Sequence, residues 1–89
     1  MTNQKGTLQL RGKRLMALAI NNGVKNAHQA TLKSGVCYPV VQRYFKKSED
    51  IESVHLRSLA GLLISACGMT PDQVLNLPLG YLFDFIPDN

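Results

Sequence analysis

The segment SGVCYPVVQRYFKK, residues 34–47, carries the strongest structural signals in the chain. Gly35 favours a tight turn, because glycine adopts a positive φ without steric cost. Pro39 then suits the first turn of a helix, where its missing amide hydrogen leaves no bond unmade. This pattern predicts a helix from about residue 38 to residue 46 or 47. The side chains expected to anchor it to the rest of the domain are Val36, Val41 and Tyr44.

A shorter helix is predicted immediately before this turn, from about residue 27 to residue 34. Asn26 can cap its first turn with its side-chain oxygen, and Gln29 stands three residues later, as in a capping box. The two helices are joined by a glycine turn, and Val41 follows Gly35 by six positions. This spacing is typical of a helix-turn-helix unit.

Helical periodicity extends over much of the remaining chain. Apolar residues at spacings of three and four predict one helix over residues 8–21 and another from about residue 54 to residue 67. The stretch MTPDQV gives the clearest start signal, with Thr70 as the N-cap and Pro71 at the first helical position. It predicts a fifth helix that ends near residue 77. We therefore expect an all-α fold of five helices, with one domain over residues 1–77.

The apolar C-terminal tail, residues 78–89, departs from helical spacing. Its apolar residues alternate as in an extended segment, although Leu82 and Ile86 interrupt the alternation. Two roles are open for this tail. Its side chains can fold back onto the core, or they can form a contact with a partner subunit.

The charges are divided unevenly along the chain. Residues 1–47 contain nine Lys or Arg and no Asp or Glu, whereas residues 48–89 contain Arg57 and six acidic residues. The two segments carry +9 and −5, which together give the net charge of +4. Such a distribution favours a basic face for an anionic partner such as nucleic acid. The alternative interpretation is a solvated surface with scattered charges.

The residues that catalysis or metal binding would require are not grouped in the sequence. Cys37 and Cys67 form no CxxC pair and are too few for a disulfide scaffold. His28 and His55 have no ligand at metal-binding spacing, and no glycine-rich phosphate loop occurs. We therefore expect no enzyme activity, no metal or other cofactor and no small-molecule ligand. The polar N-terminus and the absence of a run of ~18–20 apolar residues predict a cytoplasmic protein.

The segment NNGVKNAHQATLKSGVCYPVVQRYFKK, residues 21–47, resembles the helix-turn-helix of the lambda-repressor-like Cro/C1 (Xre) family. Its helix-turn-helix motif would span about residues 26–47, and the resemblance extends over about residues 8–77. It implies a small bacterial or phage transcriptional regulator of the repressor type. Such a protein binds double-stranded DNA as a homodimer and inserts the second helix of the motif into the major groove.

Eight residues are candidates for contacts with DNA. Those expected to read bases point away from the anchoring face of the second helix: Tyr38, Pro39, Gln42 and Arg43. Those expected to bind phosphate lie at the start of the first helix and at the end of the second: Lys25, Asn26, Lys46 and Lys47.

Each assignment has an alternative. Arg43 could instead pair with Glu49 or Glu52, and Gln42 could simply face solvent. Tyr38 could pack its ring beside the next residue, and the two lysines at the end of the helix could serve only solubility. For the whole chain, the alternative function is an antitoxin-like or accessory protein-interaction module that uses the same fold.

Overall fold

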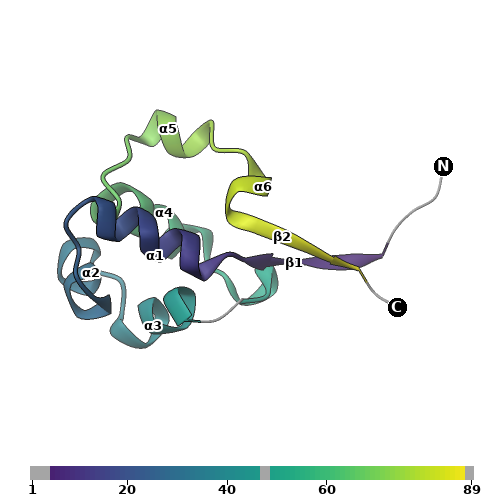
Figure 1. Cartoon of the computed structure of the whole chain (residues 1–89), viewed down its shortest axis with the longest axis horizontal. Coiled ribbons are helices and arrows are strands. Elements are labelled where there is room, and N and C mark those ends of the chain that lie inside the picture. The colour runs from purple at the N-terminus through teal and green to yellow at the C-terminus, as the bar shows by residue number, and fades with distance from the viewer. Residues whose placement is uncertain (1–4, 47–48, 88–89) are drawn as a thin grey trace.

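The chain forms a body of helices and a two-stranded ribbon that projects from it (Figure 1). The computed structural model describes residues 5–46 and 49–87 of the 89 residues. The helical elements are α1 (Gly12–Asn21), α2 (Ala27–Ser34), α3 (Tyr38–Lys46), the 3₁₀ turn η1 (Ile51–Ser53), α4 (Leu56–Gly61), the π-helical turn η2 (Leu62–Ala66), α5 (Pro71–Leu75) and α6 (Leu79–Leu82). The ribbon consists of the strands β1 (Gly6–Leu10) and β2 (Phe83–Pro87).

This ribbon shows that the expected all-α fold of five helices is wrong. β1 and β2 pair antiparallel, and Leu10 lies opposite Phe83. The first part of the predicted helix over residues 8–21 is therefore extended, and α1 begins only at Gly12. Helical periodicity is a local signal, whereas β1 obtains its hydrogen bonds from the other end of the chain. The short helix α6 was also not expected.

One hydrophobic core connects the helices to the base of the ribbon. Its buried side chains come from α1, α2, α3, α4, η2 and α6, from the loop residues Val24 and Val54, and from the residues of β1 and β2 that lie closest to the body. The largest of the fully buried side chains are Tyr44, Leu10, Leu15, Leu62, Val24 and Val41. Because α3 contributes two of these, it is held firmly against α1 and α2.

Local hydrogen bonds fix both ends of α2. Gly35 has a φ of 76° and donates its amide to the carbonyl of Thr31 at 2.8 Å, which ends the helix. At the start, the side-chain oxygen of Asn26 accepts a bond from the Gln29 amide at 2.9 Å. The Gln29 side chain accepts a bond from the Lys25 amide at 2.8 Å, one residue earlier than in a standard capping box.

Replacing Gly35 with alanine is expected to destabilise the fold by about 1–2 kcal/mol, the cost of a left-handed conformation for a residue with a Cβ atom. Beyond Gly35 and its two chain neighbours, no atom of the residues that the structure describes lies within 4 Å of the position that this Cβ would take, so the loss arises from the backbone alone. Gly80→Ala is the matched control, because its Cβ would also enter open space while its φ lies outside the left-handed region. Chemical denaturation measures the free energy of unfolding of both variants. Equal stability of the two would contradict the prediction.

The helix that follows η1 changes its geometry halfway. The single helix expected from about residue 54 to residue 67 consists of α4 and η2. In η2 the amide of Cys67 donates to the carbonyl of Leu62, five residues earlier, which is the π-helical bond. The next helix, α5, starts as expected, since Thr70 and Gln73 form both hydrogen bonds of a capping box. It ends slightly before the expected residue 77.

The C-terminal segment is divided between the core and the surface. Leu82 and Phe83 are buried in the core, where α6 meets β2. Further along the strand, Phe85 and Ile86 remain exposed. The first part of this segment therefore completes the core, and the rest forms the projecting ribbon.

Candidate nucleic-acid interface

The helix α3 presents two distinct faces. Val41, Tyr44 and Phe45 are buried against the other helices. The hydroxyl of Tyr44 also accepts a hydrogen bond from the amide of His55 at 2.9 Å, which ties α3 to the start of α4. On the opposite face, Pro39, Arg43 and Lys46 are exposed and follow one another at spacings of four and three residues. This exposed edge can be approached by a partner without disturbing the core.

Tyr38 and Gln42 lie beside this edge and contact each other. The Gln42 side-chain amide donates to the Tyr38 hydroxyl at 2.8 Å. The His28 ring of α2 meets the Tyr38 ring edge-on, with 6.3 Å between centroids. Tyr38 is therefore positioned by both helices, and Gln42 keeps its side-chain oxygen as a hydrogen-bond acceptor for a partner.

Arg43 lies at the limit of an ion pair with Glu49. Its Nε atom is 4.0 Å from the carboxylate, and its side chain is 48% exposed, compared with 15% for Glu49. A guanidinium group has five N–H donors, so this single long contact leaves most of them available. The arrangement is compatible with both interpretations of Arg43, as a partner of Glu49 and as a base-reading residue.

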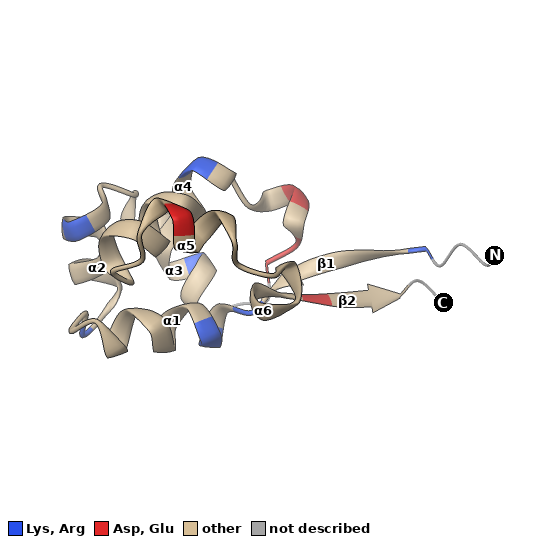
Figure 2. Ribbon diagram, turned by 90° about the horizontal axis from the view of Figure 1, so that it is seen from above, with Lys and Arg blue, Asp and Glu red and all other residues tan. Residues whose placement is uncertain are grey.

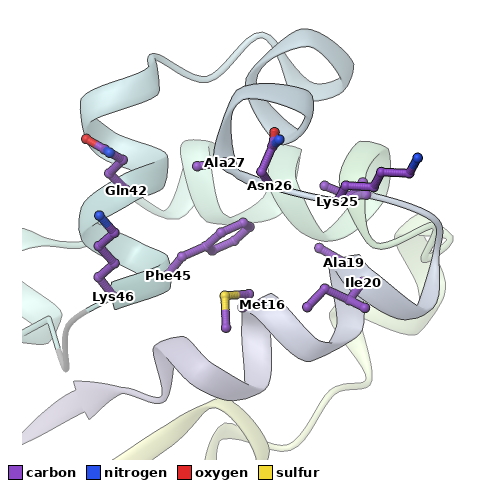
Figure 3. A pocket seen from close by; sticks show the side chains of 10 residues that line it. Met16, Ala19, Ile20, Lys25, Asn26, Ala27, Gln42, Phe45 and Lys46 are labelled. Atoms are coloured by element: carbon purple, nitrogen blue, oxygen red, sulfur yellow. The ribbon is translucent and has the colours of Figure 1, made fainter.

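A groove of about 220 Å³ lies beside α3, between the C-terminal part of α1 and the N-terminus of α2. Figure 3 shows Gln42 and Lys46 on one side of this groove and Lys25 and Asn26 on the other, with the ring of Phe45 between them. Three of the four predicted phosphate contacts and one predicted base contact are thus brought together. The fourth predicted phosphate contact, Lys47, lies outside the described residues.

The N-terminus of α2 adds hydrogen-bond donors to this groove. The side-chain oxygen of Asn26 is occupied by its capping bond, which leaves its amide nitrogen for a partner. In the described part of the chain, the backbone amides of Ala27 and His28 have no hydrogen-bond acceptor. A helix of eight residues also contributes a partial positive charge at this end. Lys25 and Lys46 add full positive charges.

Two apolar residues of the groove were missed by the sequence analysis. Met16 and Ile20 lie on α1 and are 36% and 52% exposed. They are four residues apart and lie outside the buried stripe of Leu15 and Ala19. The sequence did contain a signal for these two residues, because an apolar pair at helical spacing lay outside the stripe expected to face the core. Such side chains can contact deoxyribose or a thymine methyl next to a phosphate.

Arg11, the N-cap of α1, and Arg14 on α1 form contacts that stabilise the fold, and neither lines this groove. Arg11 forms an ion pair with Asp84 on β2. Arg14 donates to the carbonyl of Tyr81 at 2.8 Å, and its guanidinium carbon lies 4.8 Å from the centroid of the Tyr81 ring. Both arginines thus hold the C-terminal segment against α1, which the uneven charge distribution alone did not indicate.

In the structure, basic and acidic residues lie largely on different elements, as their uneven division along the sequence indicates. Lys and Arg occur just before β1 and on α1, α2, α3 and α4, whereas Asp and Glu occur around η1 and on α5 and β2 (Figure 2). The acids near η1 come closest to α3, through the contact of Glu49 with Arg43. The groove itself is lined by two lysines and no carboxylate.

Other kinds of site would need a reactive thiol, a cluster of metal ligands or a membrane-spanning helix. Burial raises the pKa of the Cys67 thiol to about 11, so this thiol is protonated at neutral pH and is a poor nucleophile. Residues 5–46 and 49–87 contain no group of three or more His, Cys, Asp or Glu that could hold a metal ion. Within the same ranges, every helix is too short or too polar to cross a bilayer.

Comparisons with protein-family models, with curated proteins and with solved structures identified no match to this chain. Its function must therefore be inferred from the site itself.

Proposed function

We propose that this protein binds double-stranded DNA, with α3 as the recognition helix in the major groove. The observation that carries the proposal is the grouping of Lys25, Asn26 and Lys46 around one groove beside the exposed edge of α3. Phosphate contacts position a protein on the duplex, and side chains on an adjacent helix can then reach the bases. The resemblance of residues 21–47 to the Cro/C1 helix-turn-helix supports the same assignment.

In this proposal the predicted contacts have different tasks. Arg43 reads guanine through two N–H groups, and Gln42 accepts a hydrogen bond from a base through its free side-chain oxygen. Tyr38 and Pro39 add a hydroxyl and an apolar surface at the first turn of α3. We further propose that the protein is a homodimeric transcriptional regulator in the cytoplasm.

Selection of bound sequences from a pool of random duplexes tests the proposal directly. We expect repeated selection to enrich a short common sequence, because side chains on the exposed edge of α3 would favour particular bases. Recovery of a random pool after several rounds, with no binding above that of an unrelated acidic protein, would contradict the proposal. That outcome would favour a role in protein interaction.

Lys46→Ala is expected to weaken binding to specific and random duplexes alike and to lower the slope of log K against log salt by about 1. Lysine binds phosphate as a point charge, so DNA binding by the variant should release about one counterion fewer than DNA binding by the wild type. Lys33→Ala is the matched control, because Lys33 is an exposed lysine of α2 that does not line the groove. Fluorescence anisotropy titrations at several salt concentrations give both slopes. If Lys33→Ala changes the slope as much, Lys46 has no particular role.

A further inference from the structure

Tyr38 and Gln42 stand one turn apart on α3 and are joined by a hydrogen bond between their side chains. The side-chain nitrogen of Gln42, Nε2, donates to the Tyr38 hydroxyl at 2.8 Å. Residues four apart on a helix are neighbours on its surface, so this bond links two adjacent side chains. Tyr38 is 41% exposed and Gln42 is half-buried, so a partner can reach both. We call these two residues the tyrosine–glutamine pair.

The bond determines which groups the pair offers to a partner. A tyrosine hydroxyl that accepts a hydrogen bond still has its own proton to donate, and a glutamine whose nitrogen donates still has its oxygen to accept. Within residues 5–46 and 49–87, the Tyr38 hydroxyl proton has no acceptor and the Gln42 side-chain oxygen has no donor. The oxygen belongs to the same amide group as the nitrogen that bonds to Tyr38. The pair therefore presents one donor and one acceptor next to each other.

The ring of Tyr38 is also held by a second helix. His28 of α2 meets this ring edge-on, with 65° between the ring planes and 6.3 Å between the centroids. Aromatic pairs favour this arrangement at centroid separations of about 4.5–7 Å. The contact restricts the Tyr38 ring, and hence its hydroxyl, before a partner arrives. Such preorganisation lowers the entropic cost of binding.

The tyrosine–glutamine pair lies beside the groove that groups the predicted phosphate contacts. Gln42 lines this groove, with Lys46 on its own side and Lys25 on the other (Figure 3). Phosphate contacts set the position of a protein on the duplex, and nearby side chains then reach the base edges. The free donor and acceptor of the pair are therefore placed next to an expected phosphate contact, where a base edge would be within reach.

The combination of one donor and one acceptor matches adenine. Adenine is the only base that offers an acceptor, N7, and a donor, the N6 amino group, on its own major-groove edge. Guanine offers two acceptors, cytosine a donor, and thymine an acceptor and a methyl group. The Tyr38 hydroxyl would donate to N7, and the Gln42 oxygen would accept from N6. A glutamine that acts alone uses its own nitrogen for N7, but the Gln42 nitrogen is directed at Tyr38.

We propose that Tyr38 and Gln42 read one adenine jointly and that His28 is a positioning residue for Tyr38. This inference rests on the proposed function, because it names a base for the proposed recognition helix. It differs from reading by Gln42 alone, because the tyrosine hydroxyl supplies the bond to N7.

Selection of bound sequences with the wild type and with two variants tests the inference. We expect Tyr38→Phe and Gln42→Ala to relax the preference for adenine at the same position of the selected sequence. Each should lower affinity for the selected duplex about three- to tenfold, because each removes one of two contacts with the base. Tyr81→Phe is the matched control and should bind like the wild type, since Tyr81 is 37% exposed on α6. Circular dichroism checks that each variant remains folded.

A selected duplex that carries 7-deazaadenine at this position identifies the atom that Tyr38 contacts. This base keeps the N6 amino group but has a carbon in place of N7. The wild type should bind it about three- to tenfold more weakly than the adenine duplex, because the bond from the Tyr38 hydroxyl is lost. Tyr38→Phe should bind the two duplexes equally. Fluorescence anisotropy titrations give the four affinities.

Two variants of His28 test its positioning role. His28→Ala should reduce the difference between the two duplexes about twofold, because it leaves the Tyr38 ring less restricted. It should not change the slope of log K against log salt, since it removes no phosphate contact. His28→Phe keeps a ring against Tyr38 and should retain the wild-type difference.

Three results would overturn the inference. They are variants of Tyr38 and Gln42 that relax different positions, a shared position that selects guanine instead of adenine, and a Tyr38→Phe variant as sensitive to 7-deazaadenine as the wild type. In each case the protein would still select a sequence, so the proposed function would stand. A wild-type protein that selects no sequence would refute the proposed function and this inference together.

Discussion

Phe83→Ala is expected to lower the free energy of unfolding by about 3–5 kcal/mol, the usual cost of removing a buried phenylalanine from a core. The Phe83 side chain is 5% exposed and belongs to the same core as Leu10, Leu82 and the buried face of α3. Because small domains are stable by only about 5–15 kcal/mol, this loss would leave much of the protein unfolded at modest denaturant concentrations. Urea denaturation, monitored by circular dichroism, measures the free energy of unfolding of the variant and of the wild type.

Phe85→Ala is the matched control for this variant. Phe85 lies two residues later on the same strand and is 45% exposed, so its loss should cost only about 1 kcal/mol. The comparison separates the two roles that the sequence left open for residues 78–89. A Phe83→Ala variant as stable as Phe85→Ala would show that the C-terminal segment does not complete the core.

Arg43→Ala is expected to lose about 1–3 kcal/mol of binding free energy on the selected sequence and to relax discrimination at one base position. A bidentate contact with guanine accounts for both effects, because it needs two N–H donors at fixed spacing. Binding to random duplexes should change much less. Anisotropy titrations with the selected duplex, and with duplexes that vary one position at a time, measure both quantities.

Two further variants distinguish the interpretations of Arg43. Arg43→Lys keeps the charge but not the planar pair of donors, so it should lose discrimination while retaining binding to random DNA. Glu49→Gln removes the carboxylate that lies 4.0 Å from Arg43. If Arg43 acts only by pairing with Glu49, Glu49→Gln should reproduce the loss caused by Arg43→Ala. If Arg43 reads a base, Glu49→Gln should leave affinity unchanged or raise it.

The parts of the fold that local chemistry determines could be predicted from the sequence. Gly35 and Asn26 set the ends of α2 through backbone conformation and capping, and Thr70 starts α5 through its capping box. These signals involve residues a few positions apart. The ribbon could not be predicted in this way, because β1 pairs with segments that are distant in the sequence, mainly β2 and also Asp50. The segment of residues 8–10 therefore had the spacing of a helix but the structure of a strand.

The candidate site could be predicted in part for the same reason. The outward direction of Arg43 and the anchoring of Val41 follow from helical spacing within α3. The groove that groups Lys25 with Lys46 depends on how α1 packs beside α3, which no local pattern specifies. The pairing of Arg14 with Tyr81 depends likewise on contacts between distant segments.

The ribbon has a consequence for the order in which the protein can fold during its synthesis. β1 leaves the ribosome early, but its partner β2 is made only after all the helices. Until then, Leu10 and Arg11 lack Phe83 and Asp84 as neighbours. The helices can begin to pack as they emerge, whereas the core is completed only when the last strand arrives. Nascent chains should therefore become resistant to protease in one late step, after residues 83–87 have left the exit tunnel.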